Sequence, residues 1–453
     1  MMQWDKLLNA NRLGNRPPKE EEGRSPFHSD HDKVIFSGSF RRLARKTQVH
    51  PLATNDHVHN RLTHSLEVAC VGRTLGMRVG QRLLEKHRIP EHFSATDIGD
   101  IVQTACLAHD IGNPPFGHTG EEAIRHWFSE DAGKDLIGDL ADDEASDLRL
   151  FEGNAQGFRV LTTTEYHPYD GGLRLTYASL GAFVKYPWLS LDAVTGDRPK
   201  RNKYGVYRAE TALFEEVAHA TGLINQGRHW YSRHPLVHLM EMADDFCYAI
   251  LDLEDGIEMG ILQWEEVFQL LRPVLDESRI DELQRDLHGL RPGRKPPLIR
   301  GKVISAFVDA GTDAFIANED AILRGEVTEL LPLCEERVRN CVQAAKQLAQ
   351  QRVYQHPRKV ELEIGAYNTI ATVLKVVCGV AVEHAEGRGK DNYRSKRVID
   401  LIGEYSFHPE LRSTGEKSPK YHALMRALDY VSGMTDNYVT HLARQFSGSG
   451  DAR

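Results

Sequence analysis

Apolar side chains recur at helical spacing along most of the chain, and this pattern predicts a largely helical protein. In residues 61–87 the apolar positions follow one stripe: Leu62, Leu66, Ala69, Leu75, Val79 and Leu83. Ser94, with Asp97 three residues later, has the pattern of a capped helix start. Pro235 stands where proline is tolerated at the opening of another helix. Because no series of strand-length alternating runs is present, we expect an all-α fold.

Glycine, proline and charged residues interrupt this pattern at four places. Residues 14–24 suggest a flexible segment, and the acidic residues 129–147 suggest a surface loop or a poorly ordered insertion. Residues 190–204 carry another loop signal, and residues 291–297 are the best candidate for a boundary. We therefore expect four parts: a flexible lead-in (1–34), a core with the candidate site (35–290), a C-terminal helical region that completes the fold (291–446) and a disordered tail (447–453).

Composition is that of an ordinary globular protein. The chain has 453 residues, 41% hydrophobic and 27% charged, which is enough for a large core. Its six cysteines include no C-x-x-C pair, as expected for reduced thiols in the cytoplasm. The apolar run Val376 to Val382 is too short to cross a bilayer, and the first residues lack a signal-peptide pattern. We expect a cytoplasmic protein with no membrane segment.

The charge balance argues against a globally basic nucleic-acid binder, because the formal net charge is −9. A local basic run is a separate matter: Arg41, Arg42, Arg45 and Lys46 fall within six residues. Either these side chains form a solvated helix face or they contact phosphate, and the sequence leaves both interpretations open.

Three expected helices carry side chains that bind divalent metals. His64 lies near the start of one, the adjacent His109 and Asp110 close a second over residues 105–111, and Asp244 lies in the third. Imidazole and carboxylate ligands without thiolate suit Mn²⁺, Mg²⁺, Fe²⁺, Co²⁺, Ni²⁺ or Zn²⁺. A His-Asp pair alone is weak support, because such a pair is often an ordinary core or surface feature.

The residues after this pair strengthen the metal interpretation. Residues 111–117 contain two glycines and two prolines, which force an irregular turn. The turn delivers His118 and Glu121 to the start of a helix expected over residues 121–128. At a spacing of three residues the carboxylate can orient the imidazole and hold its charged form. In the alternative, His118 caps the helix and Glu121 complements its dipole.

Seven stretches together resemble one known family: residues 40–49, 60–68, 108–118, 151–157, 175–178, 243–255 and 429–436. They are similar to motifs of the HD-domain deoxynucleoside triphosphate triphosphohydrolases, of which the dGTPases are the type members. The resemblance covers roughly residues 35–440, and the set of motifs is specific where the isolated His-Asp pair is not. It implies an HD-domain helical fold with a peripheral helical subdomain.

The resemblance implies that the metal ligands are His64, His109, Asp110 and Asp244. On the third helix Asp244, Tyr248 and Asp252 share one stripe at i, i+4 and i+8, which in this family serves metal, sugar ring and sugar hydroxyl in turn. Asp245 points about 100° away, where some relatives carry a phosphate-binding lysine. In the alternative the stripe is a solvated polar face.

Substrate contacts also follow from the resemblance. Gln48 matches the position that reads the deoxyribose 3′-hydroxyl, and with Val49 it would leave little room for a 2′-hydroxyl. Arg61 matches a phosphate ligand, with a surface ion pair as the alternative. Three further positions are assigned to substrate binding: Asn113, and the lysines Lys185 and Lys203, which in the alternative are solvated loop residues.

The expected reaction is metal-dependent hydrolysis of a deoxynucleoside triphosphate (dNTP) to deoxynucleoside and inorganic triphosphate. His118, oriented by Glu121, would protonate the leaving 5′-oxygen. Cleavage at the α-phosphate rests on the resemblance, because spacing does not separate it from attack at the γ-phosphate. The alternatives are another HD phosphohydrolase of nucleotides and a nucleic-acid-binding regulator with a vestigial site. The family also implies a homo-oligomer, a hexamer or another even assembly, and a single-stranded DNA or dNTP effector.

Overall fold

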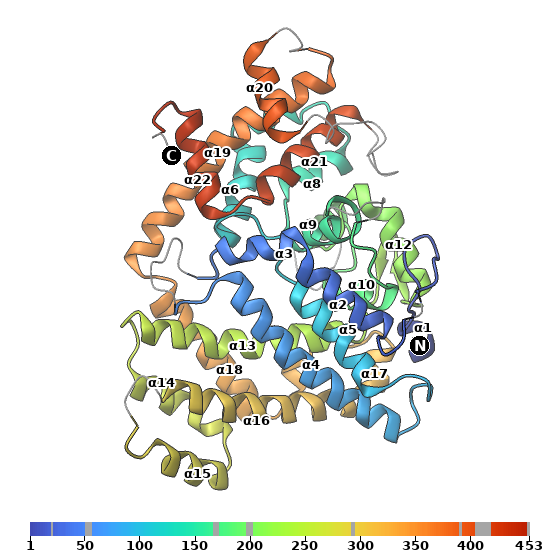
Figure 1. Ribbon diagram of the computed structural model, residues 1–453, viewed down its shortest axis with the longest axis vertical. Helices are drawn as coiled ribbons and strands as arrows, with labels where there is room; N and C mark the ends of the chain where they lie inside the picture. Colours follow the sequence, from blue (N-terminus) through green and yellow to red (C-terminus); the bar gives the residue numbers. More distant parts are fainter. Residues whose placement is uncertain are drawn as a thin grey trace.

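The computed structural model describes residues 1–19, 21–49, 57–165, 172–195, 203–290, 295–388, 392–403 and 418–450. Helices dominate these residues, and one short antiparallel sheet pairs β1 (Asn225–Gly227) with β2 (Trp230–Tyr231). The expected all-α class is confirmed. Figure 1 shows two groups of helices, one in each half of the view.

Three long helices form the centre of the first group: α4 (Arg61–Glu85), α5 (Ala95–Ala108) and α13 (Val237–Glu258). They pack against one another, and α4 approaches α5 closely at two glycines. A Cβ atom on Gly76 would lie 2.9 Å from the Cα of Gly99, so no larger side chain fits this crossing. Their buried faces belong to a hydrophobic cluster that we call the first core. Around them lie α2 (Pro26–Phe36), α10 (Tyr177–Phe183), α12 (Thr211–Ala220), α16 (Pro296–Ala317) and α18 (Glu336–Leu348).

A separate cluster, the second core, lies in the upper half of Figure 1. Its main helices are α6 (Gly117–Glu130), α8 (Asp142–Arg149), α19 (Pro357–Ala385), α20 (Tyr393–Ile402), α21 (Pro419–Ser432) and α22 (Asp436–Phe446). Helix α6 follows α5 directly in sequence, so the turn between them passes from the first core to the second. The candidate site lies at this passage.

Short elements complete the fold. The α-helical ones are α1 (Trp4–Leu7), α3 (Gly38–Arg42), α7 (Ala132–Leu136), α9 (Gly153–Arg159), α11 (Ser190–Thr195), α14 (Trp264–Leu271), α15 (Glu277–Leu287) and α17 (Glu319–Leu323). The 3-10 or π turns are η1 (Leu43–Arg45), η2 (Val160–Thr164), η3 (Arg208–Glu210), η4 (Arg272–Val274), η6 (Leu331–Leu333) and η7 (Ala349–Val353).

The expected helix starts are close to the observed ones. Ser94 caps α5, and Asp97 returns a hydrogen bond to complete the box. Pro235 lies in the turn that precedes α13, two residues before the first helical residue. Two bounds differ from expectation: α5 ends at Ala108, and α6 begins at Gly117. His109 therefore follows its helix, whereas His118 lies inside the first turn of α6.

The N-terminal residues are packed, which corrects the expected flexible lead-in. Helix α1 buries Trp4 and Leu7 against the first core, and the Trp4 Nε1 donates to Glu319 of α17 over 3.0 Å. Helix α2 then packs along α5. The charged residues 14–24 lie between α1 and α2. Their composition suggested a flexible segment, although the short helices on either side of them carry buried apolar side chains.

The acidic segment 129–147 is also ordered, against the expectation of a loop or insertion. It contains α7 and the greater part of α8, and Asp147 is fully buried. The Asp147 carboxylate accepts hydrogen bonds from Ser190 Oγ, Tyr421 OH and the Arg208 backbone N–H. Because its partners come from distant segments, the sequence pattern could not distinguish it from solvated acids. The loop expected over residues 190–204 begins with α11, and residues 196–202 lie outside the described residues.

The C-terminal region is shared between the two cores. Helices α16 and α18 pack in the first core, whereas α19, α21 and α22 build the second. The expected boundary at residues 291–297 falls just before and within α16, with residues 291–294 outside the described residues. The expected tail begins directly after α22, and its residues 451–453 also lie outside them.

Helix α19 is long and apolar enough to cross a membrane by length and composition, with a mean hydropathy of 1.5 over its best window. In the fold it packs against α6, α21 and α22. One face of the helix therefore contributes to the second core.

Candidate active site

Three helices bring the predicted metal ligands together. His64 lies in the first turn of α4, His109 follows the last residue of α5, and Asp244 lies in the second turn of α13. Each offers one ligand atom, and the three atoms lie within 4.8 Å of one another. The His64 and His109 Nε2 atoms lie 3.1 Å and 3.7 Å from Asp244 Oδ1. Two imidazole nitrogens and a carboxylate oxygen form a donor set suited to a divalent first-row metal.

A contact of its other ring nitrogen fixes the orientation of His109. Its Nδ1 lies 2.6 Å from the Cys106 carbonyl oxygen, so Nδ1 carries the proton, because a carbonyl only accepts. Nε2, the other ring nitrogen, faces Asp244. This arrangement is typical of metal-binding histidines, whose other ring nitrogen is held by a backbone or carboxylate acceptor.

Asp110, the fourth predicted ligand, lies beside this group. Its Oδ1 is 3.6 Å from His109 Nε2 and accepts a hydrogen bond from Asn113 Nδ2. Its Oδ2 is 2.8 Å from Arg61 Nη1. Asn113, predicted to bind substrate, therefore contacts a candidate metal ligand in this structure.

Both carboxylates of the site are held ionised. Burial alone would raise the pKa of Asp244, but His109, His64 and Lys185 outweigh it and lower this pKa far below the usual range. Burial likewise opposes ionisation of Asp110, and Arg61 with the two histidines lowers its pKa. Two negative charges are thus available to a bound cation.

Two of the predicted phosphate-binding cations act on these carboxylates, Arg61 on Asp110 and Lys185 on Asp244, whereas Lys203 lies beside Glu121. Arg61 is buried, and its Nη2 passes over Gly117, where a Cβ atom would lie 2.3 Å from it. Gly117 also has a positive φ of 57°, so glycine serves both the turn and the approach of Arg61. Lys185 lies 3.4 Å from Glu241 of α13, and Lys203 lies 2.8 Å from Glu152. Both lysines form ion pairs and are not free loop residues.

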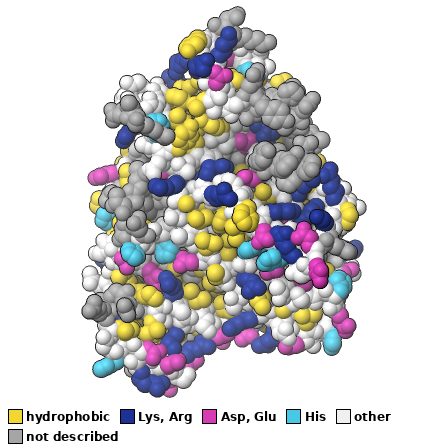
Figure 2. Space-filling view, in the orientation of Figure 1, with side chains coloured by type: hydrophobic (Ala, Val, Ile, Leu, Met, Phe, Trp, Pro, Cys, Tyr) yellow, Lys and Arg dark blue, Asp and Glu magenta, His cyan; other side chains and the backbone are white. Residues whose placement is uncertain are grey.

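The basic run before α4 is divided in two. Arg41, Arg42 and Arg45 are exposed, whereas Lys46 is buried and donates to the backbone carbonyls of Asn113 and Ser432 over 2.6 Å and 2.7 Å. Figure 2 shows Lys and Arg side chains interspersed with Asp and Glu over the visible face. Of this run, therefore, only the three arginines are available to solvent, and Lys46 links the turn of the site to α21.

His118 and Glu121 lie together on the first turn of α6. The Nδ1 of His118 is 2.9 Å from Glu121 Oε2, and the Gly153 backbone N–H donates to Glu121 Oε1 over 2.8 Å. Lys203 Nζ lies 3.7 Å from the same carboxylate. Although burial opposes ionisation, the bond to His118 and the charge of Lys203 lower the pKa of Glu121 to about 2.

Three glycines, Gly112, Gly153 and Gly157, allow this close packing. The sequence pattern placed Gly112 in the irregular turn and gave the other two no role. A Cβ atom on Gly153 would lie 2.5 Å from Asn113 Oδ1 and 2.7 Å from Glu121 Oε1. A Cβ atom on Gly112 would lie 2.1 Å from the backbone nitrogen of Gly157. The recurrence of glycine in residues 112–117 and 153–157 was the available signal.

The predicted sugar stripe lies one and two turns beyond Asp244 on α13. Tyr354, beside η7, donates a hydrogen bond from its hydroxyl to Asp252, and the rings of Tyr248 and Tyr354 are 6.0 Å apart. Burial raises the pKa of Asp252 to about 7, and the bond from Tyr354 opposes this rise. Sequence reasoning missed Tyr354, which is 102 residues from its partner. Asp245 turns away from the stripe to Lys346 Nζ at 2.6 Å.

Gln48 and Val49 lie two and three residues after Lys46. Val49 is buried, and Gln48 Oε1 is a buried acceptor with no hydrogen-bond partner among the described residues. The adjacent Thr47 is held by Asp436, which accepts from the Thr47 N–H over 2.9 Å and from the N–H of Phe116 over 2.9 Å. Helix α22 thus ties the Gln48 segment to the turn that carries His118.

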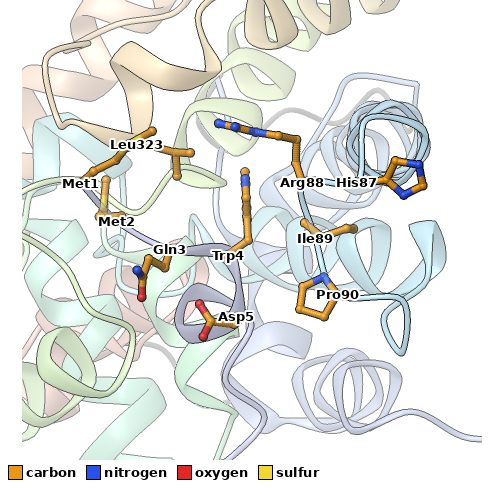
Figure 3. A pocket seen from close by; sticks show the side chains of 10 residues that line it. All are labelled: Met1, Met2, Gln3, Trp4, Asp5, His87, Arg88, Ile89, Pro90 and Leu323. Atoms are coloured by element: carbon orange, nitrogen blue, oxygen red, sulfur yellow. The ribbon is translucent and has the colours of Figure 1, made fainter.

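A cavity of about 550 Å³ lies elsewhere in the fold. Figure 3 shows that it is lined by the N-terminal residues, by residues 87–90 and by Leu323. Its lining includes Trp4 and Arg88, both bonded to Glu319 Oε1, and none of the predicted site residues.

Comparison with known proteins identifies the family of the chain. The HD domain family model matches residues 61–174, which include His64, His109, Asp110 and His118. The chain is 47% identical over 451 residues, 99% of both chains, to a protein of Pseudomonas aeruginosa named deoxyguanosinetriphosphate triphosphohydrolase-like protein. A protein of Synechocystis with the same name is 36% identical over 99% of both chains. The deoxyguanosinetriphosphate triphosphohydrolase of Serratia proteamaculans is 29% identical over 91% of this chain and 92% of its own. The protein therefore belongs to the deoxyguanosinetriphosphate triphosphohydrolase-like family of HD-domain phosphohydrolases.

Proposed function

We propose that the protein hydrolyses deoxynucleoside triphosphates to deoxynucleoside and inorganic triphosphate, with a divalent metal such as Mn²⁺ or Mg²⁺. The observation that carries the proposal is the convergence of His64, His109 and Asp244 from three helices to within 4.8 Å. Asp110, beside them, completes the proposed ligand set. When bound, the ion would neutralise phosphate charge and increase the acidity of a water molecule.

The cationic side chains are placed to hold the polyphosphate. Arg61 lies at the metal group, and its planar guanidinium can form two parallel hydrogen bonds to phosphate oxygens. Lys185 pairs with Glu241 of α13 and acts on Asp244, and Lys203 lies 3.7 Å from Glu121 of α6. Their carboxylate partners hold them charged: Glu241 raises the pKa of Lys185 against the effect of burial, and Glu121 and Glu152 do the same for Lys203.

His118 is the proposed general acid. In the reaction, water loses a proton to solvent and its oxygen bonds to the α-phosphorus, while the bond from phosphorus to the 5′-oxygen breaks. His118 gives a proton to that oxygen, and solvent then restores the proton of His118. The exposed imidazole can reach a substrate, while the buried Glu121 fixes its Nδ1 side. Glu121 is thus a positioning residue, since it acts through His118.

The deoxyribose is proposed to lie between Gln48 and the stripe on α13. The unpartnered Gln48 Oε1 can accept a hydrogen bond from the 3′-hydroxyl, and the buried Val49 limits space for a 2′-hydroxyl. Tyr248 would face the sugar ring, and Asp252, held by Tyr354, would bind a sugar hydroxyl. With these contacts the protein would prefer dNTPs to ribonucleotides.

We propose that the protein is a cytoplasmic homo-oligomer, a hexamer or another even assembly. Exposed apolar side chains on α19 support association, with Val360, Ile364 and Tyr367 all partly or largely solvent-exposed. Light scattering on the full chain with substrate tests it, and a monomer of 51.2 kDa across micromolar concentrations would contradict it. A dNTP or single-stranded DNA effector is tested by adding each to a turnover assay.

Product analysis tests the reaction. Each of the four dNTPs and four ribonucleotides is incubated with Mg²⁺ or Mn²⁺, and products are separated by ion-exchange chromatography. We expect deoxynucleoside and triphosphate in equal amounts from dNTPs. Formation of dNDP and phosphate would overturn α-phosphate cleavage. Salt-dependent DNA binding with no turnover in either metal would favour a regulator with a vestigial site.

A further inference from the structure

A second group of metal-binding side chains lies on α2, outside the candidate active site. His28, His31 and Asp32 each offer one ligand atom, and the three atoms lie within 4.8 Å of one another. The Asp32 Oδ1 is 3.1 Å from His31 Nδ1 and 4.0 Å from His28 Nε2. The two imidazole rings lie side by side, with centroids 5.5 Å apart and an interplanar angle of 22°.

Helical spacing produces this arrangement. His28 and Asp32 are four residues apart and His31 is three residues from His28, so all three project from neighbouring turns of α2. Adjacent ligands of an ion with bonds of about 2.1 Å are about 3.0–3.5 Å apart. The pair His31–Asp32 is already within this range, and His28, which is half exposed, needs only a small side-chain rotation to reach it.

Asp100 of α5 supplies a second, independent observation. Its side chain is only 3% exposed, and its Oδ2 lies 3.6 Å from His28 Nδ1. At this distance, just beyond a hydrogen bond, the charge of the carboxylate favours a proton on Nδ1, which leaves the lone pair of the other ring nitrogen for a metal. Here that other nitrogen is Nε2, which faces Asp32.

The neighbouring arginines leave the ligand atoms available. Arg24 pairs with Asp32 through Oδ2 at 2.5 Å, and Arg73 approaches Asp100 through Oδ1 at 3.5 Å. The oxygens that face the histidines are Oδ1 of Asp32 and Oδ2 of Asp100. Each arginine therefore pairs with the carboxylate oxygen that does not face a histidine.

We propose that His28, His31 and Asp32 bind a divalent transition metal of the Zn²⁺ class, with Asp100 as a positioning residue. Two imidazoles select such ions over Mg²⁺ and Ca²⁺, which prefer oxygen ligands. Asp100 precedes the end of α5 by eight residues, about 12 Å at 1.5 Å per residue. The ion is therefore distinct from one held by His109. Through His28 and Asp100 it would join α2 to α5, which stabilises the N-terminal segment.

Zn²⁺ binding to the full chain tests the proposal. Equilibrium dialysis in excess Mg²⁺ compares the wild type with His28→Gln/His31→Gln, and we expect one bound Zn²⁺ fewer per chain in the variant. Asp100→Asn should weaken the same site by roughly 10–100-fold. His288→Gln, which replaces an exposed histidine after α15, is the matched control and should keep the wild-type stoichiometry. Equal Zn²⁺ binding by the wild type and the double variant would overturn the proposal.

A measurement on the wild type alone guards against misfolding of the variants. Acylation by diethyl pyrocarbonate, read by peptide mass spectrometry, reports the accessibility of His28 and His31. Zn²⁺ should slow modification of both residues at least several-fold, whereas Mg²⁺ should leave it unchanged. Unchanged modification in Zn²⁺ would overturn the proposal whatever the variants show.

Discussion

His118 Nδ1 lies 2.9 Å from Glu121 Oε2, and the two side chains differ in exposure, at 80% and 2%. The buried carboxylate is itself fixed by the Gly153 N–H and by Lys203. An exposed imidazole on a rigid, ionised support is suited to proton transfer, because its free Nε2 can reach a ligand without losing orientation.

The first prediction concerns His118. His118→Ala should keep the bound metal and near-normal dNTP affinity but lose roughly 10²–10⁴-fold in kcat, because it removes the proton donor. Glu121→Gln should lose less, since it removes only orientation and charge support. Metal content, dNTP affinity and kcat measured on both variants check this.

Two other roles for His118 give different results. If His118 only stabilised the start of α6, His118→Ala would lower the melting temperature and leave kcat almost unchanged. If it ligated a second ion, the metal stoichiometry would fall. Normal turnover in metal-loaded His118→Ala would exclude the proposed acid while leaving the metal site in place.

The second prediction concerns the metal ligands. Alanine substitution of His64, His109, Asp110 or Asp244 should abolish bound metal and turnover. Asp245→Ala should retain metal, because its carboxylate pairs with Lys346 on the other side of α13. Metal analysis by mass spectrometry after gel filtration is the measurement. Metal loss in Asp245→Ala but not in Asp244→Ala would reverse the assignment.

The third prediction concerns Tyr354. Tyr354→Phe keeps the ring beside Tyr248 but removes the hydrogen bond to Asp252. We expect KM for dNTP to rise roughly 5–50-fold with kcat within a few-fold, because a hydrogen bond contributes about 0.5–3 kcal/mol, from a neutral to a charged acceptor. Tyr393→Phe, on the exposed side of α20, is the control. A loss confined to kcat would contradict a sugar-binding role.

The sequence allowed prediction of those parts of the site that depend on local spacing. His118 and Glu121 are three residues apart, so helical spacing alone predicted the contact between them on α6. His109 and Asp110 are adjacent in sequence, but they lie in the turn after α5 and not, as expected, in its last turn. The opposite directions of Asp244 and Asp245 on α13 followed from the same geometry and agree with their different partners.

Contacts that join distant segments were beyond local patterns. Asp252 meets Tyr354 across 102 residues, and Thr47 meets Asp436 across 389. The buried Asp147 reads in sequence as one of many surface acids, because its partners lie in segments far from it. Burial of a polar residue depends on tertiary partners, and a single sequence carries no direct signal for them.

The last prediction concerns Lys46, which joins the site turn to α21 through the carbonyls of Asn113 and Ser432. Burial, with smaller effects from neighbouring arginines, lowers the pKa of Lys46 to about 7, against 10.5 when it is solvated. Between these values the unfolded chain binds more protons than the folded one, so this group makes stability rise with pH. Below pH 7 both states are protonated and the full cost of burial applies.

Lys46→Met removes the titration. The melting temperature of the wild type minus that of Lys46→Met should increase from pH 7 to pH 9. Over this range the unfolding free energy of the wild type should gain up to about 1.4 kcal/mol per pH unit relative to the variant. Differential scanning calorimetry at pH 7, 8 and 9 measures this difference. Lys86→Met, which replaces an exposed lysine after α4, should show a difference that does not depend on pH. A constant difference for Lys46→Met would show that the ammonium remains charged in the folded protein, held by its two carbonyl acceptors.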